Sequence, residues 1–374
     1  MDIEDLKIGR DGTFIPPFKS NINTIKSYET DGYDSIFFAD HILNWIPESI
    51  WHPNITNLAK VYESPHLIYE VFSMMTTAAL NTKKVKLGTG VTETFRRNPA
   101  VLAQTIITQD QLSNGRTILG IGTGEKENIT PYGINWEKPV SRLEEAIEII
   151  RLLWENDEKF NYNGKFWKLK NAVLSLKPSK KGKFPPIWIA AHGQRMLDIT
   201  GRLGDGWLPI YLDPNSYKKK LLLIKESAKK VGRDPETITP ALYVNVIIDE
   251  DLDEVDKMIK SPIAKNHLLT LYNEDYKRLG ISHPLGESVD GVIDYIPTNY
   301  EQHTMLEILK KVPVEMCRKY YFNGTPDEVI SRIEEYAKIG VKHIVLFNYS
   351  LLCDINKIPS SNKCMKIVLD YFKK

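Results

Sequence analysis

Short apolar runs alternate with longer amphipathic stretches along most of the chain. The apolar runs have the length of buried strands, and the stretches between them carry apolar residues three and four positions apart, as helices covering a sheet do. The predicted strands are Lys7–Phe14, Ser35–Ala39, Val85–Thr92, Thr117–Leu119, Pro186–Ala191, one beginning within Asp205–Pro209, Ala241–Ile248 and Lys342–Phe347. The predicted helices are Asn21–Thr30, Pro65–Leu80, Pro99–Leu112, Ser141–Trp154, Met196–Leu203, Pro214–Val231, Thr325–Ile339 and Asn362–Phe372. Eight such units predict a (β/α)8 TIM barrel, an α/β fold, with an open doubly wound sheet as the alternative.

Three segments interrupt this alternation and are predicted to be insertions in one domain spanning residues 1–374. The segment 42–64 holds two tryptophans and is longer than a plain connection, so we expect an active-site loop. Residues 160–169 predict a small hairpin with its turn at Asn163-Gly164. The charged, Tyr-bearing block 249–312 predicts an insertion at the barrel mouth, near the C-terminal end of the seventh strand.

Composition narrows the class of protein. The 374 residues are 42% hydrophobic and 26% charged, which is typical of a folded domain with a large core, and the net charge of +1 offers no case for a nucleic-acid partner. No apolar run approaches the roughly 20 residues of a membrane span, so we expect no membrane partner and a cytoplasmic protein. The three cysteines, Cys317, Cys353 and Cys364, lack metal-type spacing, and no metal site is expected.

Chemistry-bearing residues follow the ends of four predicted strands. Asp40 and His41 follow the second, and Trp45 lies four residues beyond His41. The third ends in Gly88-Thr89-Gly90-Val91, the fourth in Gly120-Ile121-Gly122-Thr123-Gly124-Glu125, and the fifth in Ala191-His192-Gly193-Gln194. Because the carboxyl ends of barrel strands open on one mouth, we expect these residues to line a single site.

The same motifs carry a family resemblance. Phe38-Ala39-Asp40-His41, the Leu87–Thr92 segment with Arg97–Gln104, Gly120–Glu125 and Gly201–Trp207 resemble the luciferase-like flavin and deazaflavin oxidoreductases, in the branch that uses coenzyme F420. The phthiodiolone-type ketoreductases and the F420-dependent glucose-6-phosphate dehydrogenases have segments similar to Trp45-Ile46-Pro47, Ser64-Pro65-His66 and Ala190–Gly193. The phosphate-binding residues of the latter are not reproduced, so glucose 6-phosphate is disfavoured.

The resemblance implies hydride transfer between C5 of the deazaflavin and a carbonyl/alcohol substrate. It makes His41 and Glu125 proton carriers and places Trp45 on the substrate side of the ring, with Asp40 orienting His41 or bonding the cofactor. From the residues alone, Glu125 could instead be a helix N-terminal acid and Trp45 a core residue.

The resemblance also assigns residues to the cofactor. Gly90-Val91 corresponds to a non-proline cis peptide that supports the ring. Gly193, Gln194 and Arg195, opening a helix, would hold the phosphate through backbone N–H groups, although Arg195 could be an ordinary surface charge. The predicted cofactor-binding residues are Asp40, Thr89, Gly90, Val91, Gly122, Thr123, Gly124, His192, Gly193, Gln194 and Arg195.

Other functions stay open on the same scaffold. An FMN-dependent monooxygenase would use a flavin in place of F420, and an enzyme similar to methylenetetrahydromethanopterin reductase would act on a pterin. A barrel without chemistry that serves as a binding subunit is the third alternative. Family resemblance further suggests a homodimer acting on a small molecule.

Overall fold

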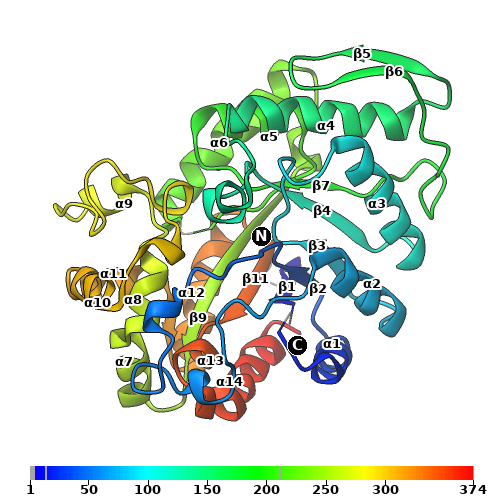
Figure 1. Ribbon diagram of the computed structural model, residues 1–374. Coiled ribbons are helices and arrows are strands. Elements are labelled where there is room, and N and C mark those ends of the chain that lie inside the picture. Colours follow the sequence, from blue (N-terminus) through cyan, green and yellow to red (C-terminus); the bar gives the residue numbers. More distant parts are fainter. Residues whose placement is uncertain (1–4, 13–14, 211, 374) are drawn as a thin grey trace.

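The strands close into a parallel barrel (Figure 1). The computed structural model describes residues 5–12, 15–210 and 212–373. Within these residues, eight strands form a closed ring in the order β9-β11-β1-β2-β3-β4-β7-β8, and β8 pairs back with β9. Their bounds are β1 (Lys7–Asp11), β2 (Ser35–Phe38), β3 (Lys86–Thr89), β4 (Thr117–Ile121), β7 (Ile187–Ile189), β8 (Gly206–Trp207), β9 (Thr239–Ile248) and β11 (His343–Asn348). The barrel prediction is confirmed; the end of the first predicted strand, residues 13–14, lies outside the described residues.

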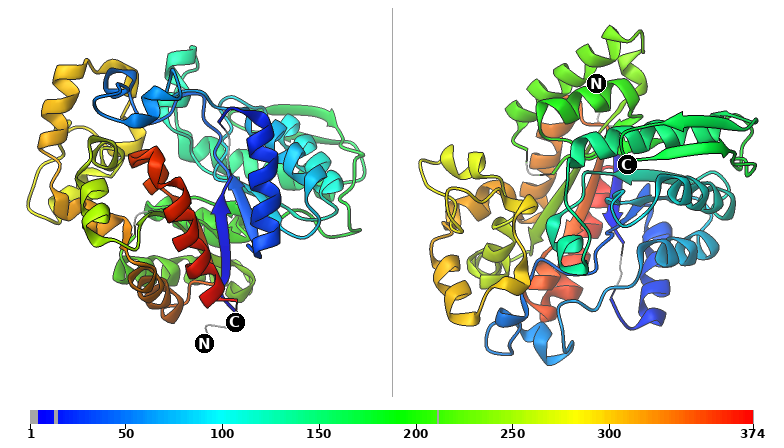
Figure 2. Two further views of the ribbon diagram at one scale, coloured as in Figure 1. Left: turned by 90° about the horizontal axis from the view of Figure 1, so that it is seen from below. Right: turned by 45° about the horizontal axis from the view of Figure 1, so that its top comes forward.

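Helices surround the barrel because each presents one apolar face to the strands. They are α1 (Phe18–Asp31), α2 (Val71–Asn81), α3 (Pro99–Leu112), α4 (Pro139–Glu155), α5 (Gln194–Leu203), α6 (Pro214–Lys230), α12 (Pro326–Lys338) and α14 (Ile358–Tyr371). Side chains at the start of two of these helices cap them locally: the Asn98 side chain caps α3, and Thr325 with Glu328 forms a capping box on α12. Figure 2 shows α14 lying beside β1, which brings the C-terminal helix against the first strand.

Apolar side chains form separate layers inside and outside the barrel. A large cluster lies between strands and helices, and a smaller one fills the interior, made of Phe37, Ile118, Trp188, Leu208, Ala241 and Val345. Between Phe37 and Trp188 the rings stack at 5.5 Å. The barrel is therefore packed below its mouth, as TIM barrels are.

A third cluster joins the predicted loop to the predicted insertion. Ile46 and Ile50 pack with residues of the block 249–312, including Leu268, Tyr295 and Met305. The block folds into α7 (Leu252–Lys260), α8 (Pro262–Leu268), α9 (Asn273–Lys277) and α10 (Gln302–Lys310), followed by α11 (Val314–Tyr320) and β10 (Phe322–Gly324). In Figure 1 these helices flank one side of the barrel, and the hairpin of β5 (Phe160–Asn163) and β6 (Lys168–Ala172) extends on another. The loop 42–64 includes the short 3₁₀ helices Glu48–Ile50 and Asn57–Lys60 and extends to residue 70.

The prediction of a helix from Pro65 is wrong by six residues, since α2 begins at Val71. Ser64 Oγ accepts from His66 N–H in a turn, and His66 Nδ1 accepts from Asn44 N–H, so this stretch is tied to the loop before it. Glu70, rather than Ser64, caps the helix by accepting from Ser73 N–H.

The hairpin is confirmed, but its predicted turn is not a two-residue one. Residues 164–167 connect the strands, because the Glu145 carboxylate of α4 accepts the backbone N–H groups of Lys165, Phe166 and Trp167. A Cβ on Gly164 would lie 2.0 Å from Glu145 Oε1, so the glycine here makes room for that carboxylate.

No helix in the described part of the chain is long and apolar enough to cross a membrane.

Candidate active site

The strand ends predicted to share a mouth do come together. Gly90 N–H donates to the Phe38 carbonyl, Thr92 N–H to that of Gly120, and Ala190 N–H to that of Ile121. These bonds continue the barrel beyond β2, β3, β4 and β7, so the backbone segments that follow the four strands lie next to one another.

His41 lies at the centre of this mouth, with different partners at its two ring nitrogens. Its Nε2 is 3.6 Å from Oε2 of Glu125. Its Nδ1 is 3.1 Å from Oε1 of Glu127, 3.1 Å from the Leu43 carbonyl oxygen and 3.0 Å from Nδ2 of Asn128. Only 10% of the His41 side chain is exposed, so these neighbours determine where its proton lies.

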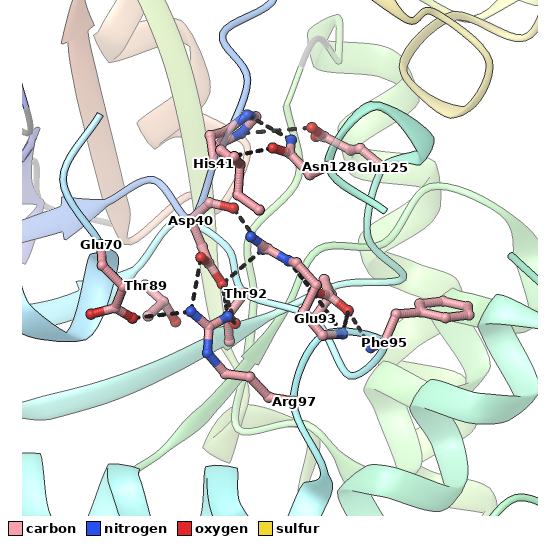
Figure 3. Close-up of polar contacts among 12 residues, drawn as sticks. Asp40, His41, Glu70, Thr89, Thr92, Glu93, Phe95, Arg97, Glu125 and Asn128 are labelled. Atoms are coloured by element: carbon pink, nitrogen blue, oxygen red, sulfur yellow. Dashed lines mark hydrogen bonds and ion pairs between the residues drawn. The ribbon is translucent and has the colours of Figure 1, made fainter. Parts of the chain in front are cut away.

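Asn128 fixes the loop that carries His41. Its Oδ1 accepts the backbone N–H groups of Ile42 (2.6 Å) and Leu43 (3.0 Å), as Figure 3 shows in part. The amide oxygen is thereby directed at the loop and the NH₂ group at His41 and Glu127, to which it is bonded at 3.0 Å. Asn128 therefore sets both the position of His41 and one donor to its ring.

Two carboxyls share this site and affect each other's protonation. Burial raises the pKa of Glu125 to about 8; His41 opposes that rise and the Glu127 carboxyl adds to it. Burial also raises the pKa of Glu127, whose side chain is only 1% exposed. An acid with a pKa near neutrality can both donate and accept a proton, as the prediction for Glu125 requires. The two carboxyls lie beside opposite nitrogens of one imidazole, an arrangement that suits proton transfer.

The Asp40 carboxyl points away from the His41 ring (Figure 3). It accepts from both terminal nitrogens of Arg97, at 2.5 and 3.2 Å, and from Thr92 Oγ1 at 2.6 Å, and it pairs with Arg96 at 3.0 Å. Asn128 and Glu127, rather than Asp40, are the side chains that contact the ring. Asp40 instead fastens the end of β2 to the segment after β3.

Trp45 lies edge-on to His41, with ring centroids 4.7 Å apart, and the insertion holds it there. Asn266 of α8 donates to the Trp45 carbonyl at 2.9 Å and is itself bonded to the Tyr295 hydroxyl. The His267 ring packs against Trp45 at a tilt, with ring centroids 4.8 Å apart, and burial lowers the pKa of His267 to about 3, so it packs there as a neutral ring.

The glycines after β3 and β4 allow close approach between backbones. The Gly90-Val91 peptide bond is cis, as the resemblance implied. A Cβ on Gly120 would lie 1.9 Å from the Thr89 carbonyl oxygen, and one on Gly122 would lie 3.0 Å from Val91. Thr89 Oγ1 donates to the Gly120 carbonyl at 2.6 Å, and Gly124 adopts φ +83°, which favours glycine. Thr123, between these glycines, is half-buried.

The end of β7 forms another side of the mouth. The His192 ring packs on Tyr272 at 5.3 Å, and burial lowers the pKa of His192 to about 3, so it is neutral. Gly193 is the N-cap of α5 and no side chain caps that helix among the described residues, so its first N–H groups are free to bind an anion. Arg195 instead bonds Ser141 and Glu144 of α4, which supports its reading as a surface charge.

A family model described as luciferase-like monooxygenase matches residues 6–343. The chain belongs to this luciferase-like family. It is 38% identical over 363 residues to the phthiodiolone/phenolphthiodiolone dimycocerosates ketoreductase of Mycobacterium tuberculosis, covering 96% of this chain and 94% of the ketoreductase.

The chain is also similar to two other oxidoreductases. The chain is 34% identical over 324 residues to the 5,10-methylenetetrahydromethanopterin reductase of Archaeoglobus fulgidus, covering 86% of this chain and 87% of the reductase. Its fold matches an F420-dependent secondary alcohol dehydrogenase solved with an F420-acetone adduct, with a TM-score of 0.75, 21% identity and 99% coverage of both chains. This last likeness shows the luciferase-like barrel fold alone.

The luciferase-like pattern in the sequence located His41, Trp45 and Glu125 but missed three groups that contact them. Glu127 and Asn128 lie just past Glu125, and their signal was a polar, acidic run continuing beyond the strand end. Asn266 lies 221 residues from Trp45, and nothing local in the sequence indicates that contact.

Proposed function

We propose that this luciferase-like oxidoreductase depends on coenzyme F420 and transfers a hydride between C5 of the deazaflavin and the carbon of a carbonyl/alcohol pair. The observation that carries the proposal is His41, held at the mouth between the carboxyls of Glu125 and Glu127 and beside Trp45. Carbonyl reduction consumes a proton and alcohol oxidation releases one, and a histidine with acidic neighbours can serve both directions.

The residues present fit a cofactor with a flat ring and a phosphate. The open N-terminus of α5 at Gly193, where a Cβ would meet nothing within 4 Å, suits a phosphate. Gly90, Gly122 and Gly124, which follow β3 and β4, offer backbone without side chains near the end of β2 that carries His41. Bound F420 would supply or accept the hydride, and this chain would orient the substrate at Trp45 and move the proton at His41 Nε2.

Names of relatives support the same proposal without deciding the substrate. The ketoreductase relative is named for a ketone, and the alcohol dehydrogenase neighbour is named for F420. The reductase relative makes a methylene pterin the second candidate substrate class, within the same F420 chemistry.

The test is a binding and turnover comparison. Purified protein is titrated with F420 and with FMN, and F420 absorbance is followed with secondary alcohols, ketones, sugar phosphates and a methylene pterin. We expect F420 to bind at least tenfold more tightly than FMN and an alcohol or ketone to turn over. Tight FMN binding with oxygen consumption and no affinity for F420 would replace the proposal with a monooxygenase. That the protein is a cytoplasmic homodimer stays a prediction from the sequence.

A further inference from the structure

The neighbours of His41 Nδ1 suit this atom both when it carries a proton and when it does not. The Leu43 carbonyl oxygen, at 3.1 Å, can only accept, so it suits Nδ1 when Nδ1 carries a proton. Asn128 Nδ2, at 3.0 Å, can only donate, so it suits Nδ1 when Nδ1 is unprotonated and presents a lone pair. Because two backbone N–H groups fix the Asn128 amide orientation, this donor cannot flip into an acceptor.

Glu127 is the third neighbour of Nδ1, at 3.1 Å, and it alone of the three can change from donor to acceptor. An ionised Glu127 accepts a hydrogen bond from Nδ1–H, whereas a protonated Glu127 donates a hydrogen bond to the lone pair of Nδ1. With a side chain only 1% exposed, Glu127 exchanges protons with its buried neighbours more readily than with water.

We propose that Glu127 is the proton reservoir behind His41, so that its protonation state selects the His41 tautomer and thereby decides whether Nε2 donates or accepts. With Glu127 protonated, Nδ1 is an acceptor and Nε2 carries the proton. With Glu127 ionised, Nδ1 carries the proton and Nε2 presents a lone pair. Glu127 is a positioning residue that acts through His41.

The catalytic consequence rests on the proposed function. In carbonyl reduction, reduced F420, when bound, would supply the hydride from its C5–H bond to the carbonyl carbon. On this chain, the His41 Nε2–H bond breaks as the alcohol O–H bond forms. In the same step the Glu127 O–H bond breaks and an Nδ1–H bond forms. The imidazole is neutral before and after, and the negative charge left on Glu127 balances the positive charge that loss of a hydride would leave on the cofactor. Alcohol oxidation runs these proton transfers in reverse.

The other ionisable groups that face the two carboxyls keep one charge state near neutral pH. Tyr132 and Tyr295 face Glu127, and burial raises the pKa of each, so both stay neutral. Tyr272 and Arg96 face Glu125; burial raises the pKa of Tyr272, and Arg96 stays charged. The charge changes of this cluster are therefore confined to His41, Glu125 and Glu127.

The experiment measures the His41 tautomer in cofactor-free full-length protein by ¹⁵N NMR of labelled histidine, with His41→Asn used to assign the signals. We expect the proton to move from Nε2 to Nδ1 as pH rises and Glu127 ionises. In Glu127→Gln the carboxyl beside Nδ1 is gone, so the shift of the proton to Nδ1 with rising pH should be lost, and any change that remains, from ionisation of Glu125 beside Nε2, should favour Nε2–H. Glu127→Asp should restore the shift to Nδ1. Glu155→Gln, at an exposed position on α4, is the matched control and should behave as wild type.

A tautomer ratio in Glu127→Gln that follows pH as in wild type would overturn the proposal. So would a single, pH-independent tautomer in the wild-type protein, a measurement that stands even if the variant fails to fold. Neither result depends on F420, so the proposal can fail while the proposed function holds, and the reverse. If F420 turnover is found, Glu127→Gln should lower kcat by about 10²-fold with the KM for F420 unchanged, and Glu127→Asp should recover part of it.

Discussion

His41 Nε2 and Glu125 Oε2 lie 3.6 Å apart, longer than an ordinary hydrogen bond. The two groups stand side by side, and each is available to a third group at the mouth. A substrate oxygen that contacts Nε2 would therefore also lie near a carboxyl whose pKa is raised to about 8.

Replacing His41 should abolish turnover and spare cofactor binding. In His41→Asn the side chain keeps polar contacts to the loop but cannot carry a proton, so kcat should fall by about 10²–10⁴-fold. The Kd for F420, measured by fluorescence titration, should change less than threefold. Turnover at the wild-type rate would remove His41 from the mechanism.

Glu125 should make the protein less stable as pH rises through neutrality. Its folded pKa, about 8, lies above the ordinary glutamate value of 4.5, so between these values the folded state binds more protons than the unfolded state. The free energy of unfolding then decreases with pH, by at most about 1.4 kcal/mol per pH unit for one proton. Urea unfolding between pH 5 and pH 8 should show a shallower decrease in Glu125→Gln than in wild type. Equal slopes would show that Glu125 ionises normally.

Asp40 should matter for stability more than for chemistry. Its carboxyl is 4% exposed and neutralises Arg96 and Arg97, so Asp40→Asn leaves two partly buried guanidinium groups under-paired and should cost about 3 kcal/mol. Asp157→Asn, which removes an exposed partner of Lys177, is the control and should leave the denaturation midpoint unchanged. A stable Asp40→Asn protein that has lost F420 binding would instead assign Asp40 to the cofactor.

Replacement by alanine should destabilise the fold strongly at one glycine of the mouth and weakly at another. Gly120→Ala drives a Cβ against the Thr89 carbonyl and should destabilise the fold by about 1–3 kcal/mol or more. Gly193→Ala meets open space and should cost less than about 1 kcal/mol, the loss of a favoured N-cap. If α5 binds the cofactor phosphate, Gly193→Ala should still weaken F420 binding, as measured by fluorescence titration beside thermal unfolding. Unchanged affinity would place the phosphate elsewhere.

The sequence predicted the barrel because its signals are local. Short apolar strand runs, helical periodicity, the Asn98 cap and the Thr325 capping box each depend on residues close together in the chain, and each appears in the structure. The start of α2 could not be predicted in this way. The turn at Ser64 and the contact of His66 with Asn44 hold residues 65–70 outside the helix, and that contact spans 22 positions.

The same difference between local signals and long-range contacts explains which features of the site could be predicted. His41, Trp45 and Glu125 follow strand ends and carry recognisable motifs, so they could be named from the sequence. The orientation of Asp40 depends on Arg97, 57 residues away, and the support of Trp45 depends on Asn266. The segment Gly120–Glu125 was predicted to line the site, whereas Gly120, within β4, admits the Thr89 carbonyl, a requirement that only the paired strands reveal.

Isotope transfer is the decisive test of hydride transfer between an alcohol and F420. A secondary alcohol that turns over in the substrate panel, deuterated at its carbinol carbon, is incubated with the protein and oxidised F420 without oxygen, and the reduced cofactor is analysed by mass spectrometry and NMR. One deuterium is expected at C5 of the deazaflavin, and none with His41→Asn over the same time. Failure of every alcohol, ketone and pterin to exchange hydride with F420, together with FMN-dependent oxygen consumption by the same preparation, would contradict it.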